Sequence, residues 1–213
     1  MKLKQFVTIG IIILGLLGGT AVGLWLSGKW QSPPSLSKAS TGAQPAHTKG
    51  SENAVVTLEE FGDLQCPPCA NLHEEIKLLQ EEYGTKLRIV YRHFPLESHK
   101  HAVEAAQAAE AAALQGKFWE MQNLLFERQD EWSESNNVRQ SFIGYARQLN
   151  LDEPKFVQDM DSPQVKERIN SDKQRGDSVS ISATPTLFVN GEEIASESMS
   201  AEGIRKAVDS AIR

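Results

Sequence analysis

Cysteine is scarce in this chain, which has only two among its 213 residues. Two cysteines allow one bridge at most, so a small scaffold held together by several disulfides is excluded. The hydrophobic fraction of 40% and the charged fraction of 23% are ordinary for a globular protein, so wholesale disorder is excluded as well. The length favours one domain, or one domain with an insertion.

Acidic residues are missing from the beginning of the chain. Residues 1–50 contain five lysines and no aspartate or glutamate. Residues 51–213 therefore carry 17 basic and 28 acidic groups, a net charge of −11, against −6 for the whole chain. Because an acidic globular part repels phosphate backbones, we expect no nucleic-acid partner.

An apolar run occupies residues 6–26, where two threonines are the only polar side chains, and Lys2 and Lys4 precede it. Its length of 21 residues matches a hydrocarbon core of roughly 30 Å at 1.5 Å per residue. The lysines should stay in the cytoplasm, so the rest of the chain crosses the membrane. We therefore expect residues 1–30 to form a single-pass anchor of the cell membrane, with the globular part outside, in the periplasm or the extracellular space.

A cleaved signal peptide, which would leave a secreted protein, remains the alternative for this segment. Cleaved signals usually have an apolar core of about 7–15 residues, and no clean A-x-A site follows this longer run. The lack of a cysteine just after the run argues against a lipidated N-terminus. Residues 31–53 are rich in small and polar residues without a hydrophobic period, so they predict a flexible linker.

The globular part, residues 54–213, alternates between strand and helix patterns and shows no internal repeat. Strands are predicted over residues 54–61, 87–94, 186–189 and 192–195, the last two joined by an Asn190-Gly191 hairpin turn. Helices are predicted from the cysteine motif to Tyr83, over 98–115 with Ser98 as cap, over 117–128, around 138–149, after the caps Asp152 and Ser162, and over 200–213. This order predicts a mixed α/β fold with a helical insertion at about residues 98–178.

The two cysteines, Cys66 and Cys69, lie three residues apart where the first strand gives way to a helix. Such a pair can close a small disulfide ring, and the free N–H groups and dipole of the helix N-terminus stabilise a thiolate at the leading cysteine. Pro67 suits the first helical turn, and exported segments usually meet oxidising conditions. The pair therefore predicts redox activity.

Two other uses of the cysteines are less favourable. A structural disulfide at this spacing closes almost no loop, so it would stabilise the fold little. A zinc site needs four ligands, which one CxxC motif and five scattered histidines do not supply, so we expect no metal. His73 is expected on the surface, and His99 and His101 do not share a helical face, which argues against a metal site there.

Several motifs together resemble those of the DsbA-like thiol-disulfide oxidoreductases, a thioredoxin-fold family. They are the CPPC sequence at residues 66–69 after a strand, and a T-P step at residues 184–185 followed by TLFVNG. The sequences YRHFPL at residues 91–96 and QGKFWE at residues 115–120 are typical of its membrane-anchored and exported branch. The likeness covers roughly residues 54–213, and it implies a thioredoxin-like α/β fold with a helical insertion.

The resemblance also implies roles for individual residues. Cys66 would be the attacked, solvent-facing sulfur and Cys69 the buried resolving sulfur. The Thr184–Pro185 bond would be cis, and its loop would lie beside the sulfur pair, where a client peptide could pair as an added strand. We therefore expect Thr184 and Pro185, with Pro67 and Pro68, to form the substrate-binding site; neither a metal nor an organic cofactor is needed.

Glu60 matches the position of the family's buried acid and could pass a proton to or from Cys69. Glu59 should point to the opposite face of the strand, and a pair of solvated charges at a strand end remains the alternative. Pro68 departs from the family prototype, which has a histidine there that can stabilise the thiolate. We therefore predict a less acidic Cys66, and a less extreme oxidant, than in the prototype.

The favoured function is disulfide exchange with the thiols of exported proteins, acting as an oxidase. In that case a membrane partner, such as a quinone-linked thiol oxidase, must reoxidise Cys66 and Cys69. The same residues could serve a disulfide reductase or an isomerase, since the direction depends on the reduction potential. A peptide-binding holdase in which the sulfurs are incidental is the alternative from another class.

Overall fold

The computed structural model describes residues 41–213. The predicted membrane segment, residues 1–30, lies outside them, as does part of the predicted linker. From residue 41 onward, no helix combines the length and the apolar character needed to cross a membrane.

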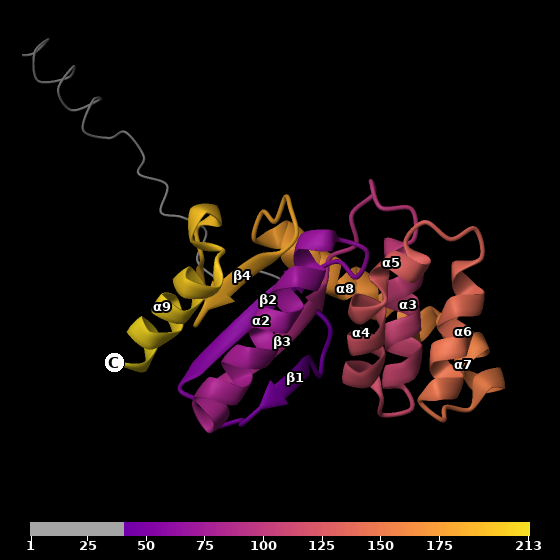
Figure 1. Cartoon of the computed structure of the whole chain (residues 1–213), viewed down its shortest axis with the longest axis horizontal. Helices are drawn as coiled ribbons and strands as arrows, with labels where there is room; N and C mark the ends of the chain where they lie inside the picture. Colours follow the sequence, from indigo (N-terminus) through magenta and orange to yellow (C-terminus); the bar gives the residue numbers. More distant parts are fainter. Residues whose placement is uncertain (1–40) are drawn as a thin grey trace, which may run out of the picture. The chain divides into compact units, whose positions relative to one another are not determined.

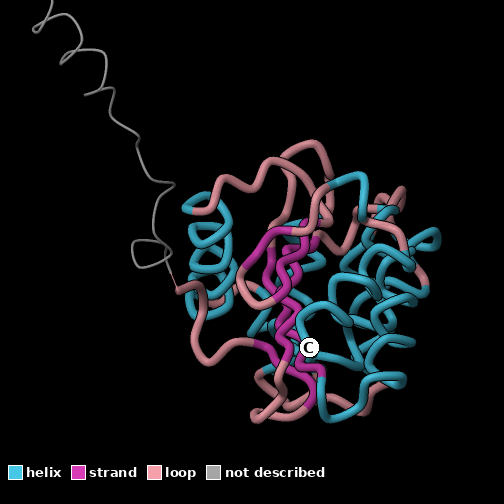
Figure 2. Tube along the Cα trace, turned by 90° about the vertical axis from the view of Figure 1, so that its left-hand side faces the viewer, coloured by secondary structure: helices cyan, strands magenta, loops and turns pink. Residues whose placement is uncertain are grey.

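Within the described residues, a mixed sheet of five strands forms the centre of the fold (Figures 1 and 2). The strands are β1 (His47–Gly50), β2 (Val56–Gly62), β3 (Leu87–His93), β4 (Thr186–Val189) and β5 (Glu192–Glu193). Their order is β1-β3-β2-β4-β5, and only β2 and β3 pair in parallel. The three inner strands, β3, β2 and β4, are mostly buried, as expected for strands that helices cover on both faces. The mixed α/β prediction is confirmed.

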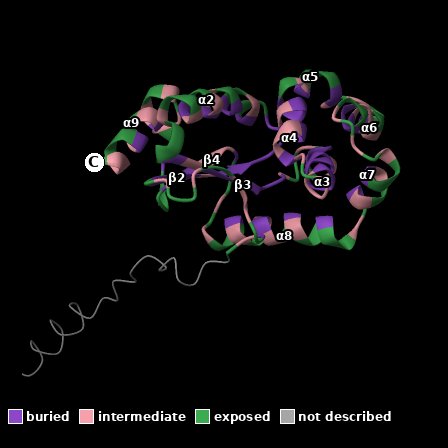
Figure 3. Ribbon diagram, turned by 90° about the horizontal axis from the view of Figure 1, so that it is seen from below, coloured by how far each residue is buried: buried purple, intermediate pink, exposed green. Residues whose placement is uncertain are grey.

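Helices lie on both faces of the sheet and at its side. They are α2 (Pro67–Tyr83), α3 (Ala102–Ala113), α4 (Phe118–Glu127), α5 (Gln129–Trp132), α6 (Val138–Gln148), α7 (Glu153–Met160), α8 (Pro163–Ser178) and α9 (Ala201–Ile212), with short 3-10 turns at Gly84–Lys86 and Ser196–Ser198. Figure 3 shows α2 and α9 on one face, α8 on the other, and α3 to α7 beside the sheet. The segment from α3 to α8 therefore stands between β3 and β4 as a helical insertion.

Two of the predicted N-terminal capping residues are confirmed, and one is wrong. Asp152 and Ser162 cap α7 and α8 as predicted, each accepting a hydrogen bond from a backbone N–H of the first turn. The prediction that Ser98 caps a helix is wrong, because α3 begins only at Ala102. The preceding segment is held in turns by Asp63, whose carboxylate accepts the backbone N–H of Leu96 and contacts the ring of His99.

The predicted linker over residues 31–53 is wrong for residues 47–50, which form strand β1. This strand pairs antiparallel with β3 and lies at one edge of the sheet. Its sequence, HTKG, has no alternation of apolar and polar residues, so no strand pattern is visible there. Tertiary contacts hold it instead, because the ring of His47 stacks on Phe118 at 3.5 Å between centroids.

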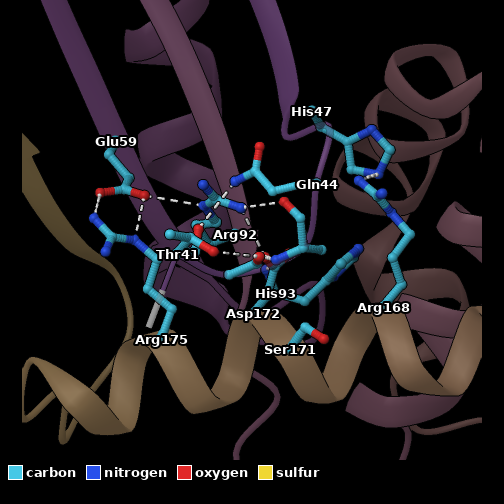
Figure 4. Close-up of polar contacts among 12 residues, drawn as sticks. Thr41, Gln44, His47, Glu59, Arg92, His93, Arg168, Ser171, Asp172 and Arg175 are labelled. Carbon is cyan, nitrogen blue, oxygen red and sulfur yellow. Dashed lines mark hydrogen bonds and ion pairs between the residues drawn. The ribbon is translucent and has the colours of Figure 1, made fainter. Parts of the chain in front are cut away.

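A charged network fastens the residues before β1 to helix α8 (Figure 4). Asp172 is 1% exposed and accepts hydrogen bonds from the backbone N–H of Ala43 and from Arg92, both at 2.9 Å. Arg92 also donates to the carbonyl of Ala43 at 2.8 Å, and Arg168 donates to the carbonyl of Pro45 at 2.8 Å. The folded domain therefore begins by residue 43, earlier than the predicted residue 54.

Candidate active site at the cysteine pair

The two cysteines stand at the N-terminus of α2. Cys66 is the extended residue just before the helix, and its carbonyl accepts the backbone N–H groups of Cys69 and Ala70 at 3.1 and 3.2 Å. Both cysteines are free, so the structure shows the dithiol form. Cys66 keeps 4% of its surface exposed and Cys69 none. The prediction that Cys66 faces solvent therefore holds only in comparison with Cys69.

The surroundings of Cys66 favour its thiolate. A hydrogen bond from the Cys69 thiol lowers the pKa of Cys66 most, and the side chain of Thr184 and the backbone N–H of Cys69 act in the same direction. Burial and the charge of Asp63 oppose them, and the resulting pKa is about 6. At neutral pH the more exposed sulfur is thus mostly ionised, the form that attacks and leaves in disulfide exchange.

Cys69 has the opposite electrostatic environment. Burial raises its pKa far above the usual value, and the hydrogen bond to Cys66 and the charge of Glu60 raise it further. Cys69 therefore stays protonated while Cys66 is ionised. This inequality gives the two sulfurs different chemical roles.

The loop before β4 lies against the reactive sulfur. The Thr184–Pro185 bond is cis, as the resemblance implied, and the Sγ of Cys66 lies 3.2 Å from the carbonyl oxygen of Thr184, to which it donates in its thiol form. β4 pairs antiparallel with β2, the strand that leads to the cysteines, and this pairing brings two segments 118 residues apart together.

Two grooves flank the first turns of α2, the helix that Cys66 precedes. One has a volume of about 440 Å³ and is lined by Pro68, Asn71, Leu72, Glu75, Pro185, Ser196, Met199 and Ala201. The other has a volume of about 460 Å³ and is lined by Pro67, Ala70, Asn71, Glu74, Glu75, Phe126, Glu127, Gln129 and Asp130. Pro68 and Pro185 thus lie together on one groove, whereas Pro67 lies on the other.

Two residues that the sequence did not single out hold the cysteine loop in place. The side-chain amide of Gln129 donates to the carbonyls of Leu64 and Cys66, at 2.8 and 3.2 Å. Asp63 accepts the backbone N–H of Gln65 at 2.7 Å from within the same loop. No sequence pattern marks Gln129 for this role, because its partners lie more than 60 residues away.

Glu60 is buried, with 3% of its surface exposed. Burial raises its pKa to about 8, with a smaller contribution from the charge of Cys66. Glu59 lies on the opposite face of β2 and pairs with Arg92 and Arg175, at 2.9 and 2.6 Å. The alternative of two solvated strand-end charges is therefore wrong, and the predicted burial of Glu60 is confirmed.

The histidines near the site differ from expectation in one case. His73 was predicted on the surface, but only 6% of it is exposed, because α4 packs over this side of α2 and brings the ring of Phe126 to 4.9 Å. His99 contacts Asp63 at 2.7 Å. Among residues 41–213, no group of three or more His, Cys, Asp or Glu side chains could hold a metal ion.

The fold and the cysteine motif together are those of thioredoxin-like proteins. Residues 43–210 match the family described as Thioredoxin, so the chain belongs to that family. A thioredoxin-like oxidoreductase from Silicibacter pomeroyi DSS-3 superposes with a TM-score of 0.65 at 26% identity, over 78% of this chain and 92% of that one. The resemblance stated from the motifs is thereby confirmed.

Other solved structures share the fold at lower identity. The oxidised form of BdbD from Bacillus subtilis superposes with a TM-score of 0.71 at 21% identity, over 82% of this chain and 98% of that one. DsbA2 from Pseudomonas aeruginosa does so with a TM-score of 0.60 at 23% identity, over 76% and 91%.

Curated relatives are similar over only part of their length. The chain is 42% identical over 149 residues to the Na⁺/H⁺ antiporter NhaA 1 of Mycolicibacterium gilvum, which is 68% of this chain and 23% of the antiporter. The chain thus spans about a quarter of these relatives, and the antiport activity in their name is not carried over to it.

Proposed function

We propose that this protein is a thiol-disulfide oxidoreductase that exchanges disulfides with the thiols of exported proteins, working as an oxidase. The inequality of the cysteine pair carries this proposal. Cys66 retains some exposure and has a pKa of about 6, whereas Cys69 is fully buried and stays protonated. A stabilised Cys66 thiolate favours the reduced enzyme, and a couple whose reduced form is stabilised is an oxidant.

The exchange proceeds in two steps. A client thiolate attacks the Sγ of Cys66 in the oxidised enzyme, forming a mixed disulfide, and the Cys66–Cys69 bond breaks with its electron pair leaving on Cys69. Cys69 then takes up a proton, for which Glu60 is the proposed donor. A second client thiolate attacks the client sulfur of the mixed disulfide, and Cys66 leaves as the thiolate. The client loses two electrons and the enzyme gains them.

The client peptide binds in the groove between Pro68 and Pro185 and pairs as an added strand with the loop of Thr184. The lining of this groove supports the assignment, because Pro185 directly follows Thr184, whose carbonyl oxygen lies 3.2 Å from the Sγ of Cys66. Pro67 shapes the first turn of α2 from the side of the second groove. Hydrogen bonds between the backbones of client and enzyme do not depend on the client's side chains, which suits clients of varied sequence.

The predicted N-terminal segment completes the proposal. Residues 1–30 would hold the domain at the outer side of the cell membrane, or be removed as a signal to leave a secreted protein. A membrane protein of the quinone-linked thiol oxidase type would accept the two electrons from the reduced pair. The chemistry at the cysteines themselves needs no metal or organic cofactor.

A trapping experiment tests the proposal. In the Cys69→Ala variant the Cys66 thiolate can still attack a disulfide of an exported client, releasing one client thiolate, but no Cys69 is left to resolve the mixed disulfide. Covalent adducts should therefore accumulate, and a reducing agent should release them. Cys66→Ala is the matched control and should form none. A Cys69→Ala variant that captures no client would contradict the proposal, and a Cys66→Ser variant with unchanged function would favour a holdase.

The direction of electron flow needs a separate measurement. The reduction potential of the Cys66–Cys69 couple, obtained by equilibration with glutathione buffers, should be higher than that of the glutathione pool. A potential well below it would assign the protein as a reductase instead.

A further inference from the structure

A buried carboxylate joins strand β1 to the helical insertion. Glu110 of α3 is fully buried, and its Oε1 lies 2.7 Å from Nε2 of His47 and 3.1 Å from Nε2 of His93. Its other oxygen, Oε2, forms an ion pair at 2.8 Å with Nε of Arg168 on α8. Figure 4 shows the side chains of His47 and Arg168 pointing toward one another. Four elements, β1, β3, α3 and α8, therefore meet at one carboxylate.

The surroundings of the His47 ring oppose a positive charge on it. Its side chain is 14% exposed and stacks on Phe118, and Nη2 of Arg168 lies 3.1 Å from its Nε2. A proton on this ring would place a second cation beside Arg168, with one carboxylate shared between them. Burial lowers the pKa of His47 most, and the charges of Arg168 and His93 lower it further, against the opposing contribution of Glu110. The ring is therefore neutral near pH 7 while β1 is in place.

Strand β1 buries little of its own surface. It has four residues, lies at the edge of the sheet and pairs with β3 alone. Lys49 and Gly50 are exposed, and His47 and Thr48 are half-buried. A strand with so few buried contacts opens at a low cost in free energy. The protonation state of the His47 ring can therefore decide whether this strand stays on the sheet.

We propose that the contact between His47 and Glu110 is an acid-sensitive latch, which holds β1 on the domain while the ring is neutral and releases it when the ring takes a proton from solvent. In the released strand the ring lies in water, where its ordinary pKa of 6.5 applies. Because the pKa is lower in the docked strand, docking loses stability as the pH falls below 6.5. Release leaves the backbone of β3 unpaired along Arg88–Tyr91, and an unpaired strand edge can pair with another chain.

The carboxylate of the latch keeps its charge over the pH range that matters. Burial acts to raise the pKa of Glu110, but hydrogen bonds and charges from His47 and His93 outweigh it and hold the pKa far below its usual value. Between about pH 7.5 and about pH 5 the carboxylate is thus mostly ionised in the docked and the released state. The titratable or charged groups that face His47 or the ends of β1 are Lys49 of β1, Tyr91, Arg92 and His93 of β3, Glu110 of α3, Glu120 of α4, and Arg168 and Asp172 of α8.

Amide hydrogen exchange on the wild-type full chain, kept in detergent, measures the opening of β1 directly. The opening constant of the β1 amides, which is the exchange rate divided by the intrinsic rate, should rise about tenfold from about pH 7.5 to about pH 5, because one histidine gains a proton on release. The amides of β2, an inner strand, should show no such rise. An opening constant of β1 that does not change with pH, or an equal rise in β2, would overturn the latch.

Two variants assign the pH dependence to His47. His47→Gln keeps a polar side chain that does not titrate, and His47→Phe keeps a ring to stack on Phe118, so both should lose the rise in opening at low pH. The matched control is His101→Gln, which changes another buried histidine, one that contacts Gln65 and Glu104, and it should keep the full rise. A rise that persists in His47→Gln and His47→Phe, or that disappears in His101→Gln, would contradict the assignment.

The latch involves neither cysteine, so its test is separate from that of the proposed function. The Cys66→Ala variant should show the wild-type exchange profile of β1 at every pH. If Cys69→Ala captures clients while β1 opens equally at all pH values, only the latch is wrong. If Cys69→Ala captures none while β1 opens in acid, the latch stands and the proposed function is wrong.

Discussion

Glu59 and Glu60 are neighbours in the chain, yet the two faces of β2 give them opposite properties. Burial acts to raise the pKa of Glu59, but hydrogen bonds and charges from Arg175 and Arg92 outweigh it and hold the pKa below its usual value. On the other face no cation offsets the burial of Glu60, and its pKa rises to about 8. The comparison shows that partners, more than burial, decide whether a buried carboxyl is ionised.

The two faces of the sheet accordingly serve different purposes. On the α8 face, Arg92 forms ion pairs with Glu59 and Asp172 and also holds Ala43, in the segment just before β1 (Figure 4). On the α2 face, Glu60 lacks such partners and lies near the cysteines, where a carboxyl that can gain and lose a proton is useful. We infer that one face provides stability and the other provides proton exchange.

The largest effect is expected from Glu59→Gln, which would leave two mostly buried arginines without this counter-charge. It should lower the free energy of unfolding near pH 7 by about 3 kcal/mol, while the rate of disulfide exchange stays unchanged. Because the folded-state pKa of Glu59 is lowered, its contribution is present above the unfolded value of 4.5 and is lost as the pH falls below it. Urea unfolding near neutral and acidic pH measures this, and a variant as stable as wild type near neutral pH would contradict it.

Glu60→Gln should change the rate of disulfide exchange, which Glu59→Gln leaves unchanged. The reduction rate should fall by about 100-fold near pH 7, since the proton donor is lost. The folded-state pKa of Glu60 is raised, so its contribution to stability is complete below 4.5 and is lost as the pH rises towards about 8.

This loss amounts to about 1.4 kcal/mol per pH unit for a single group. In the reduced protein, Glu60→Gln should remove that slope, and urea unfolding of both proteins across this pH range would show it. The same slope in variant and wild type would mean that Glu60 titrates normally.

The smallest effect is expected from Pro68→His, which acts on Glu60 only through Cys66. A protonated histidine beside the thiolate should lower the pKa of Cys66 from about 6 by about one unit. The ultraviolet absorbance of the thiolate measures this titration, and Pro68→Ala controls for the loss of proline itself. A Cys66 that is already strongly acidic in the wild type would contradict the expectation drawn from Pro68.

Local signals in the sequence predict much of the fold. The capping residues Asp152 and Ser162, the CPPC helix and the strand at 186–189 appear as expected, because neighbouring residues determine each of them. Strand β1 does not, because its stability comes from pairing with β3 and from contacts to the helical insertion. A polar edge strand carries no periodic signal of its own.

The residues of the candidate site also differ in whether the sequence alone reveals them. The spacing of Cys66 and Cys69 and the position of Glu60 could be found by sequence. Their surroundings could not, because Arg92 and Arg175 reach Glu59 across 33 and 116 residues. Gln129 lies on a short helix of the insertion, and only tertiary packing brings its amide to the carbonyls of Leu64 and Cys66.

The two edge strands of the sheet affect whether molecules of this protein can associate with one another. β1 has four residues and β5 only two, and exposed charges stand on them at Lys49, Glu192 and Glu193. A strand from another molecule would find few unpaired backbone groups there and would have to bury a charge. In the proposed function the protein meets unfolded chains at close range, and these short, charged edges would protect it from polymerising through its sheet.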